Sequence, residues 1–150
     1  MSNDEAIPPV KKLRQKLDEF AARVPIWSLT LFTVDGYIIA HRAASERIPD
    51  GIEMAISSMS AGLITISEDF IRMIDASKTF RSVLVDSVDE AGVLNFSILL
   101  GTVADNVLLS CVFPRTTQLG LITFELETLG NEIRETIREW DVKLHSETMT

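Results

Sequence analysis

An apolar hairpin near one end of the chain and a strand that runs into an amphipathic helix near the other limit how this sequence can fold. The hairpin spans Trp27 to His41, where Asp35-Gly36 separates two runs of β-forming residues. Asp-Gly between such runs predicts a tight turn, because a type I′ turn needs positive φ at both central residues. The strand-to-helix junction spans Val107 to Trp140, and Pro114 ends its strand because proline has no N–H to donate.

Helical periodicity marks both ends of the chain. The first stripe has 4-3-4 spacing and consists of Leu13, Leu17, Phe20 and Val24. It predicts an amphipathic helix that ends before Pro25. The last helix is predicted from about Thr117, with a charged face opposite its apolar stripe. That stripe consists of Ile122, Leu126, Leu129, Ile133, Ile137, Trp140 and Leu144.

The middle of the chain predicts one long helix that is apolar on several faces. Asp50 is the expected N-cap, with Glu53 in the capping-box position, and the helix is expected to run to about Ala76. The expected core stripe consists of Ile52, Ile56, Met59, Leu63, Ile66, Phe70 and Ile74. A stripe of small residues and a further apolar face accompany it. A helix apolar on several faces has several neighbours, and one of these could be the first helix of the same chain.

Three further strands are expected at residues 80–88, 93–100 and 106–113, with turns at 89–92 and 101–105. The order is therefore α-β-β-α-β-β-β-α. We predict an α+β fold with a five-stranded, mostly antiparallel sheet, the long middle helix on one face and the terminal helices on the other. The domain is expected at residues 10–144, after a disordered lead at 1–9 and before a tail at 145–150.

Bulk properties exclude several classes of function. The net charge of -8 argues against non-specific binding to nucleic acid and against attraction to anionic membranes. No apolar run is long enough to span a membrane, and the polar, acidic first residues do not resemble a signal peptide. The lone Cys111 fits a reducing compartment. We expect a cytoplasmic protein without membrane insertion.

No residue set predicts catalysis. The sequence contains neither G-x-x-x-x-G-K-[ST] nor G-x-G-x-x-G, and His41 and His145 have no cysteine or histidine at metal-ligand spacing. Cys111 is expected to be a buried apolar side chain. Arg115 could act as an arginine finger in trans, although a surface role is the stronger interpretation. We therefore expect no enzyme activity of its own, no cofactor and no metal.

Two stretches together resemble the roadblock/dynein light-chain family. The hairpin LTLFTVDGYIIAH, residues 29–41, is similar to the family's first strand pair. The stretch VLLSCVFPRTTQLGLITFELETLGNEI, residues 107–133, is similar to its last strand, the Leu-Gly-Leu at Leu119-Gly120-Leu121 and its final helix. The resemblance covers roughly residues 10–141.

The resemblance implies a homodimer or a roadblock heterodimer whose middle helices lie side by side and whose third strands pair. It also implies binding to a small Ras-like GTPase without enzyme activity of the dimer itself. The third strand would otherwise be a bare edge, which favours association. The predicted dimer residues are Ala55, Ser58, Gly62, Phe80, Ser82 and Leu84. The predicted GTPase-binding residues, on the outward side of the middle helix, are Met54, Ser57, Ala61, Ile64 and Glu68.

A small-molecule sensor domain of the PAS or GAF type is the alternative. Such a domain needs a cavity with polar groups inside its apolar set. Asn95, Ser97 and Ser110 are the obvious polar residues in the last strands. So few polar residues favour a filled core and therefore the GTPase interpretation.

Overall fold

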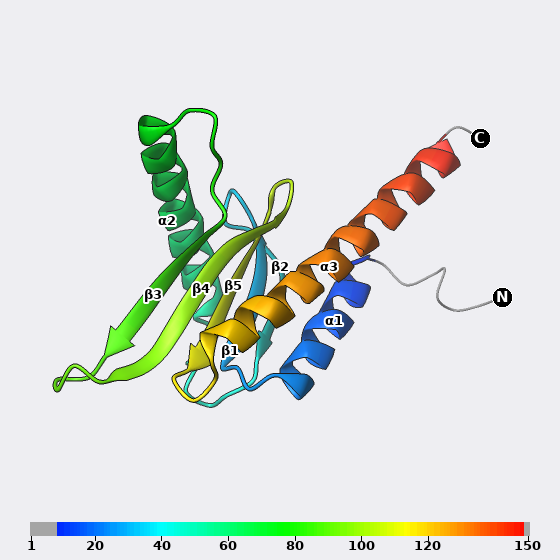
Figure 1. Ribbon diagram of the computed structural model, residues 1–150. Coiled ribbons are helices and arrows are strands. Elements are labelled where there is room, and N and C mark those ends of the chain that lie inside the picture. The colour runs from blue at the N-terminus through cyan, green and yellow to red at the C-terminus, as the bar shows by residue number, and fades with distance from the viewer. Residues whose placement is uncertain (1–8, 149–150) are drawn as a thin grey trace.

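The computed structural model describes residues 9–148, with side chains described through Trp140. Its elements are α1 (Pro9–Arg23), β1 (Ser28–Thr33), β2 (Ile38–Ala43), α2 (Glu53–Ile74), β3 (Ser82–Val88), β4 (Leu94–Ala104), β5 (Val107–Pro114) and α3 (Leu119–Thr148). The strands form one antiparallel sheet in the order β2-β1-β5-β4-β3. Helix α2 lies on one face and α1 and α3 lie on the other (Figure 1). The predicted fold is confirmed.

The main core fills the space between the sheet and the two terminal helices. All four residues of the predicted α1 stripe are buried there, and α1 ends at Arg23, ahead of Pro25. From α3, Ile122, Leu129 and Ile133 are buried in the same cluster, with Leu126 and Ile137 at its margin. The stripes predicted for both terminal helices are confirmed over the part of the chain with described side chains.

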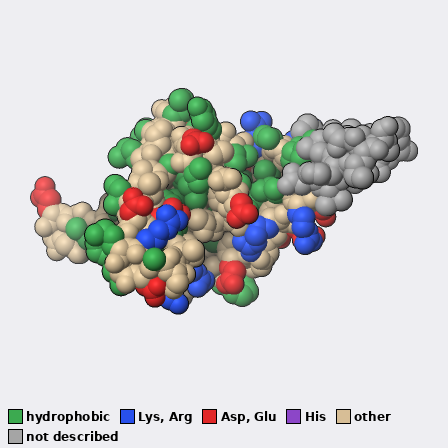
Figure 2. Space-filling view, turned by 90° about the horizontal axis from the view of Figure 1, so that it is seen from above, with side chains coloured by type: hydrophobic (Ala, Val, Ile, Leu, Met, Phe, Trp, Pro, Cys, Tyr) green, Lys and Arg blue, Asp and Glu red, His purple; other side chains and the backbone are tan. Residues whose placement is uncertain are grey.

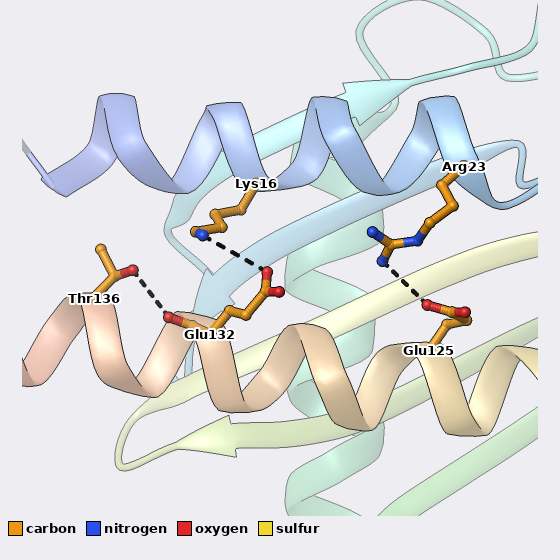
Figure 3. Close-up of polar contacts among 5 residues, drawn as sticks. All are labelled: Lys16, Arg23, Glu125, Glu132 and Thr136. Carbon is orange, nitrogen blue, oxygen red and sulfur yellow. Dashed lines mark hydrogen bonds and ion pairs between the residues drawn. The ribbon is translucent and has the colours of Figure 1, made fainter.

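Two ion pairs join the terminal helices along their shared side. Lys16 Nζ lies 3.8 Å from Glu132, and Arg23 Nη2 lies 3.1 Å from Glu125 (Figure 3). Later residues of α1 face earlier residues of α3, so the two helices are antiparallel. Exposed pairs of this kind contribute about 0–1 kcal/mol each. Burial of the two apolar stripes therefore dominates the packing of this layer.

The β1–β2 turn differs from the predicted type I′ turn. The Gly36 N–H donates to the Thr33 carbonyl at 2.9 Å, and Gly36 has φ of 87° whereas Asp35 has no positive φ. This pattern is a type I turn followed by a left-handed glycine, the other common hairpin solution. A Cβ on Gly36 would stand 3.3 Å from the Ser58 Cα, so glycine also allows the turn to approach α2.

Two predicted boundaries are wrong. Helix α2 begins at Glu53 after Ile52, which caps it without a side-chain hydrogen bond. Gly51 has φ of 78°, so the chain turns between Asp50 and the helix, and Asp50 is not the cap. Strand β4 continues to Ala104 through most of the predicted 101–105 turn, which leaves only Asp105 and Asn106 in the connection to β5.

The ends of the domain also differ from the predicted limits. Helix α1 starts at Pro9, and the rest of the predicted lead, residues 1–8, lies outside the described residues. Helix α3 continues to Thr148, through most of the predicted tail, and residues 149–150 again lie outside. Helix α1 ends beside the early turns of α3, where Arg23 pairs with Glu125, and the last turns of α3 extend past the sheet (Figure 1).

Candidate interaction surface

The face of α2 that packs on the sheet is made of small side chains. Of its 22 residues, four are buried, namely Ser57, Ser60, Ala61 and Ile64. Ala61 and Ile64 belong to a small cluster with Phe32 of β1 and Leu108 of β5. The outward placement predicted for Ser57, Ala61 and Ile64 is therefore wrong, because these residues hold the helix to its own sheet.

Part of the sheet beneath α2 is polar. Ser28 and Thr30 of β1 and Ser110 of β5 are all buried, and Thr30 and Ser110 are cross-strand partners. The hydroxyls of Ser28 and Ser110 have no hydrogen-bond partner among the described residues. A buried hydroxyl without a partner costs free energy. On the helix side, the contact between α2 and the sheet is made mostly by small side chains, with Ile64 the one large buried residue of α2.

His41 of β2 belongs to the same polar face. Its Nδ1 lies 2.8 Å from the Thr30 Oγ1, and the two groups share a hydrogen bond. Burial lowers the pKa of His41 below its ordinary value, and the negative charge of Glu53 on α2 offsets part of that effect. The folded protein therefore favours the neutral imidazole.

We expect the His41 imidazole to make the protein less stable in acid. The unfolded chain takes up this proton near pH 6.5, whereas the folded chain resists it to lower pH. The contribution of His41 to the free energy of unfolding is therefore complete above about pH 6.5. It is lost as the pH falls through the pKa that His41 has in the folded protein. Asparagine cannot titrate in this range. The urea midpoint of His41→Asn should therefore fall less than that of the wild type as the pH is lowered from about 7.5 to 5. Equal slopes for both proteins would contradict this.

An open apolar groove runs beside α2, above parts of β3, β4 and β5. Its volume is about 720 Å³. Its floor is formed by Val85 of β3, Phe96, Ile98 and Leu100 of β4, and Val112 of β5. Its wall is formed by Ile52, Ile56, Met59, Leu63 and Ile66 of α2. At one end Arg47 stacks over Trp27 at 5.1 Å, and Trp27 lies 5.3 Å from Phe96.

Five residues of the helix stripe that the sequence assigns to the core, from Ile52 to Ile66, line this groove. Met59, Ile66, Phe70 and Ile74 are exposed, and Leu63 is at the margin. The predicted core stripe is therefore wrong for the single chain. Hydrophobic side chains gather over the part of the surface where α2 lies (Figure 2). Large contiguous apolar patches on a protein surface often mark sites of contact with another protein.

The residues predicted for a dimer contact fall into two groups. Ala55, Ser58 and Gly62 are exposed on α2, and a Cβ on Gly62 would meet no atom within 4 Å. Ser82 and Leu84 are exposed on β3, which is an edge of the sheet. Phe80, by contrast, is 6% exposed, precedes β3 and belongs to the cluster under α2. Its prediction as an edge contact is corrected, because its side chain fills the core of its own chain.

A second exposed surface lies where the β1–β2 turn meets the start of α2. The Ser57 hydroxyl lies 2.9 Å from the Gly36 carbonyl and 3.0 Å from the Met54 carbonyl, which ties turn to helix. Tyr37 and Met54 beside it are 73% and 72% exposed. Met54 thus keeps the outward position predicted for it, and Glu68 is half-buried further along the helix. Tyr37 was missed because the sequence interpretation treated the turn only as a connection.

The residues with possible chemistry are dispersed. Cys111 is fully buried, and burial raises the pKa of its thiol, which disfavours a nucleophilic thiolate. Arg115 is exposed at the end of β5. Within the described part of the chain, no group of three or more potential ligands could hold a metal ion. No helix among the described residues is both long and apolar enough to cross a membrane.

Comparison with known proteins identifies the fold. The sequence matches no protein-family model and no curated protein. A Roadblock/LC7 domain from Streptomyces avermitilis superposes with TM-score 0.71 at 15% identity, covering 83% of this chain and 97% of that chain. The gliding protein MglB from Thermus thermophilus gives 0.75 at 15%, covering 89% and 93%. An MglB structure with a tetrameric arrangement gives 0.75 at 14%, also covering 89% and 93%. The chain therefore has the fold of the Roadblock/LC7 domains.

Proposed function

We propose that this chain is a non-catalytic regulator or scaffold that associates with a second copy of itself and binds a small Ras-like GTPase. The observation that carries the proposal is the apolar groove beside α2, on a fold shared with MglB and other Roadblock/LC7 domains. The GTPase part rests on the family resemblance in the two sequence stretches described above. A cytoplasmic location suits such a role.

The groove and the stripe are complementary surfaces on one molecule. The groove is lined by apolar side chains, and Met59, Ile66, Phe70 and Ile74 of the α2 stripe are exposed. Two copies related by a two-fold axis could therefore each place α2 over the groove of the other copy. This arrangement is isologous and closes on itself, as most soluble oligomers do. In this arrangement the α2 stripe would be buried in a core that the two copies form together.

The edge strand β3 supports the same arrangement. Among the residues that the structure describes, it pairs with β4 on one side only, and the backbone donors and acceptors of its other side have no strand partner. Pairing of β3 with its counterpart would satisfy these groups and join two sheets into one. Ser82 and Leu84, exposed on β3, and Ala55 and Gly62, beside the α2 stripe, would then lie at the contact.

Tyr37 and Met54 are our proposed GTPase contact. Neither lines the groove, so both stay accessible when a second copy occupies it. An exposed tyrosine beside a methionine provides a large contact area that adapts to a partner. The groove itself does not support a small-molecule sensor, because it is open and its lining is almost entirely apolar.

The proposal is tested by mixing the purified protein with small Ras-like GTPases from the same organism. Each GTPase is loaded with GDP or with a non-hydrolysable GTP analogue, and binding is measured by interferometry. We expect one GTPase to bind with a preference for one nucleotide state, and the protein alone to hydrolyse no GTP. The proposal fails if no GTPase of the set binds in either state.

Removing both exposed side chains should weaken that binding. A Tyr37→Ala/Met54→Ala protein should lose about tenfold or more in affinity, since contact residues of this type often contribute over 1 kcal/mol. Phe124→Ala is the matched control, because Phe124 is 66% exposed on α3, in the opposite layer. Equal losses in both proteins would place the GTPase contact elsewhere.

A further inference from the structure

The apolar stripe on α2 has nearly the same spacing in both directions from Leu63. Ile52 and Ile74 lie eleven residues on either side of it, and Ile56 and Phe70 lie seven. An antiparallel pair of identical helices centred on Leu63 would therefore place Ile52 beside Ile74 of the second copy. A register centred on Ala61 also matches the stripe with itself, placing Ile52 opposite Phe70. In both antiparallel registers the C-terminal turn of one α2 lies near Ile52 of the second copy.

The register centred on Leu63 brings the end of one α2 to the mouth of the other copy's groove. Ile48 and Ile52 line that mouth together with Arg47 and Trp27. Directly after Ile74, α2 ends at its C-cap, Asp75. The carboxylate of Asp75 would therefore arrive where Arg47 is exposed.

We infer that Arg47 of one copy pairs with Asp75 at the C-terminal end of α2 in the second copy, and that this pair fixes the antiparallel register. The inference rests on the self-association proposed above. The pair occurs twice in a symmetric dimer, once at each end of the joined helices.

Both charged groups are held in place before the copies meet. The Arg47 guanidinium is stacked on the Trp27 ring at 5.1 Å. The Asp75 Oδ1 accepts hydrogen bonds from the Ser77 N–H at 3.0 Å and the Ser77 hydroxyl at 2.7 Å. Side chains that are already ordered lose less entropy on pairing.

The helix itself adds to the attraction. The C-terminal end of an α-helix carries partial negative charge, so the end of α2 favours a cation. Arg72 and Lys78 flank Asp75, and Asp75 is the one carboxylate between Phe70 and Phe80. At the proposed register it is therefore the carboxylate that can meet Arg47.

Charge reversal tests the pair. The dissociation constant of the homodimer is measured by sedimentation equilibrium at low and high salt. Arg47→Glu and Asp75→Arg should each raise it about tenfold at low salt, because each reversal creates two like-charge contacts. The double variant, with the charges exchanged, should return to within about threefold of the wild type. Circular dichroism establishes that each variant is folded.

Arg115→Glu is the local control. Arg115 lines a neighbouring cleft with Trp27 and Arg47 but lies outside the apolar groove. Its reversal changes the net charge equally and should leave the dissociation constant unchanged. An equal effect of Arg115→Glu, or no recovery in the double variant, overturns the pair while the dimer stands. A wild-type protein that remains monomeric overturns the proposed self-association as well.

Discussion

An Ile64→Asp protein should fail to fold. Ile64 is 2% exposed and packs with Phe32 and Leu108 beneath α2. A carboxylate there would be buried in an apolar cluster whose described residues provide no cation. Truncation of a buried isoleucine to alanine alone costs about 2–5 kcal/mol, and a buried charge costs more. Whole domains are stable by only about 5–15 kcal/mol. Circular dichroism and thermal melting measure the result.

Ile64→Ala keeps this prediction testable if the aspartate variant gives no soluble protein. It should fold with a free energy of unfolding about 2–5 kcal/mol below that of the wild type, as measured in urea. A wild-type urea midpoint for Ile64→Ala, or a wild-type melting temperature for Ile64→Asp, would show that Ile64 does not lie against the sheet.

An Ile66→Asp protein should give the opposite result, a folded chain that does not dimerise. Ile66 is only two residues further along α2 but is 67% exposed and lines the groove. In the proposed dimer each copy would bury one such carboxylate in an apolar contact, so we expect the dissociation constant to rise roughly 100-fold or more. Light scattering at micromolar concentration and circular dichroism give the two readouts.

Phe124→Asp is the matched control for Ile66→Asp. Phe124 is 66% exposed, on the opposite layer of the molecule, so the same loss of apolar surface should leave the dimer intact. If Ile66→Asp still dimerised with wild-type affinity, the groove would not be the contact between copies.

The sequence predicts the terminal layer well because its residues meet within one chain. Leu17 and Ile133 have the spacing that buries an amphipathic helix, and both lie in the core shared by α1, α3 and the sheet. The order of the strands along the chain follows from the Pro and Gly positions between β-forming runs, whereas their order in the sheet comes from the structure. The β1–β2 turn was placed correctly but not its type, since Asp-Gly serves in more than one tight turn.

The middle helix shows where sequence periodicity is insufficient. Its most apolar stripe, around Leu63, satisfies every rule for a core face, yet Ser57 and Ala61 face the sheet instead. The hydroxyls of Ser28 and Ser110 on the sheet suit small, polar residues on the helix above them. A hydrophobic pattern predicts that a helix face is buried, but it does not show whether the face is buried within its own chain or against another molecule.

The four buried residues of α2 have a consequence for how the protein responds to its own abundance. Because so few residues of α2 are buried within one chain, the proposed dimer would add most of the remaining burial, and that contribution would depend on how many chains are present. The amount of protein in the cell would then set how much of the assembled surface is available.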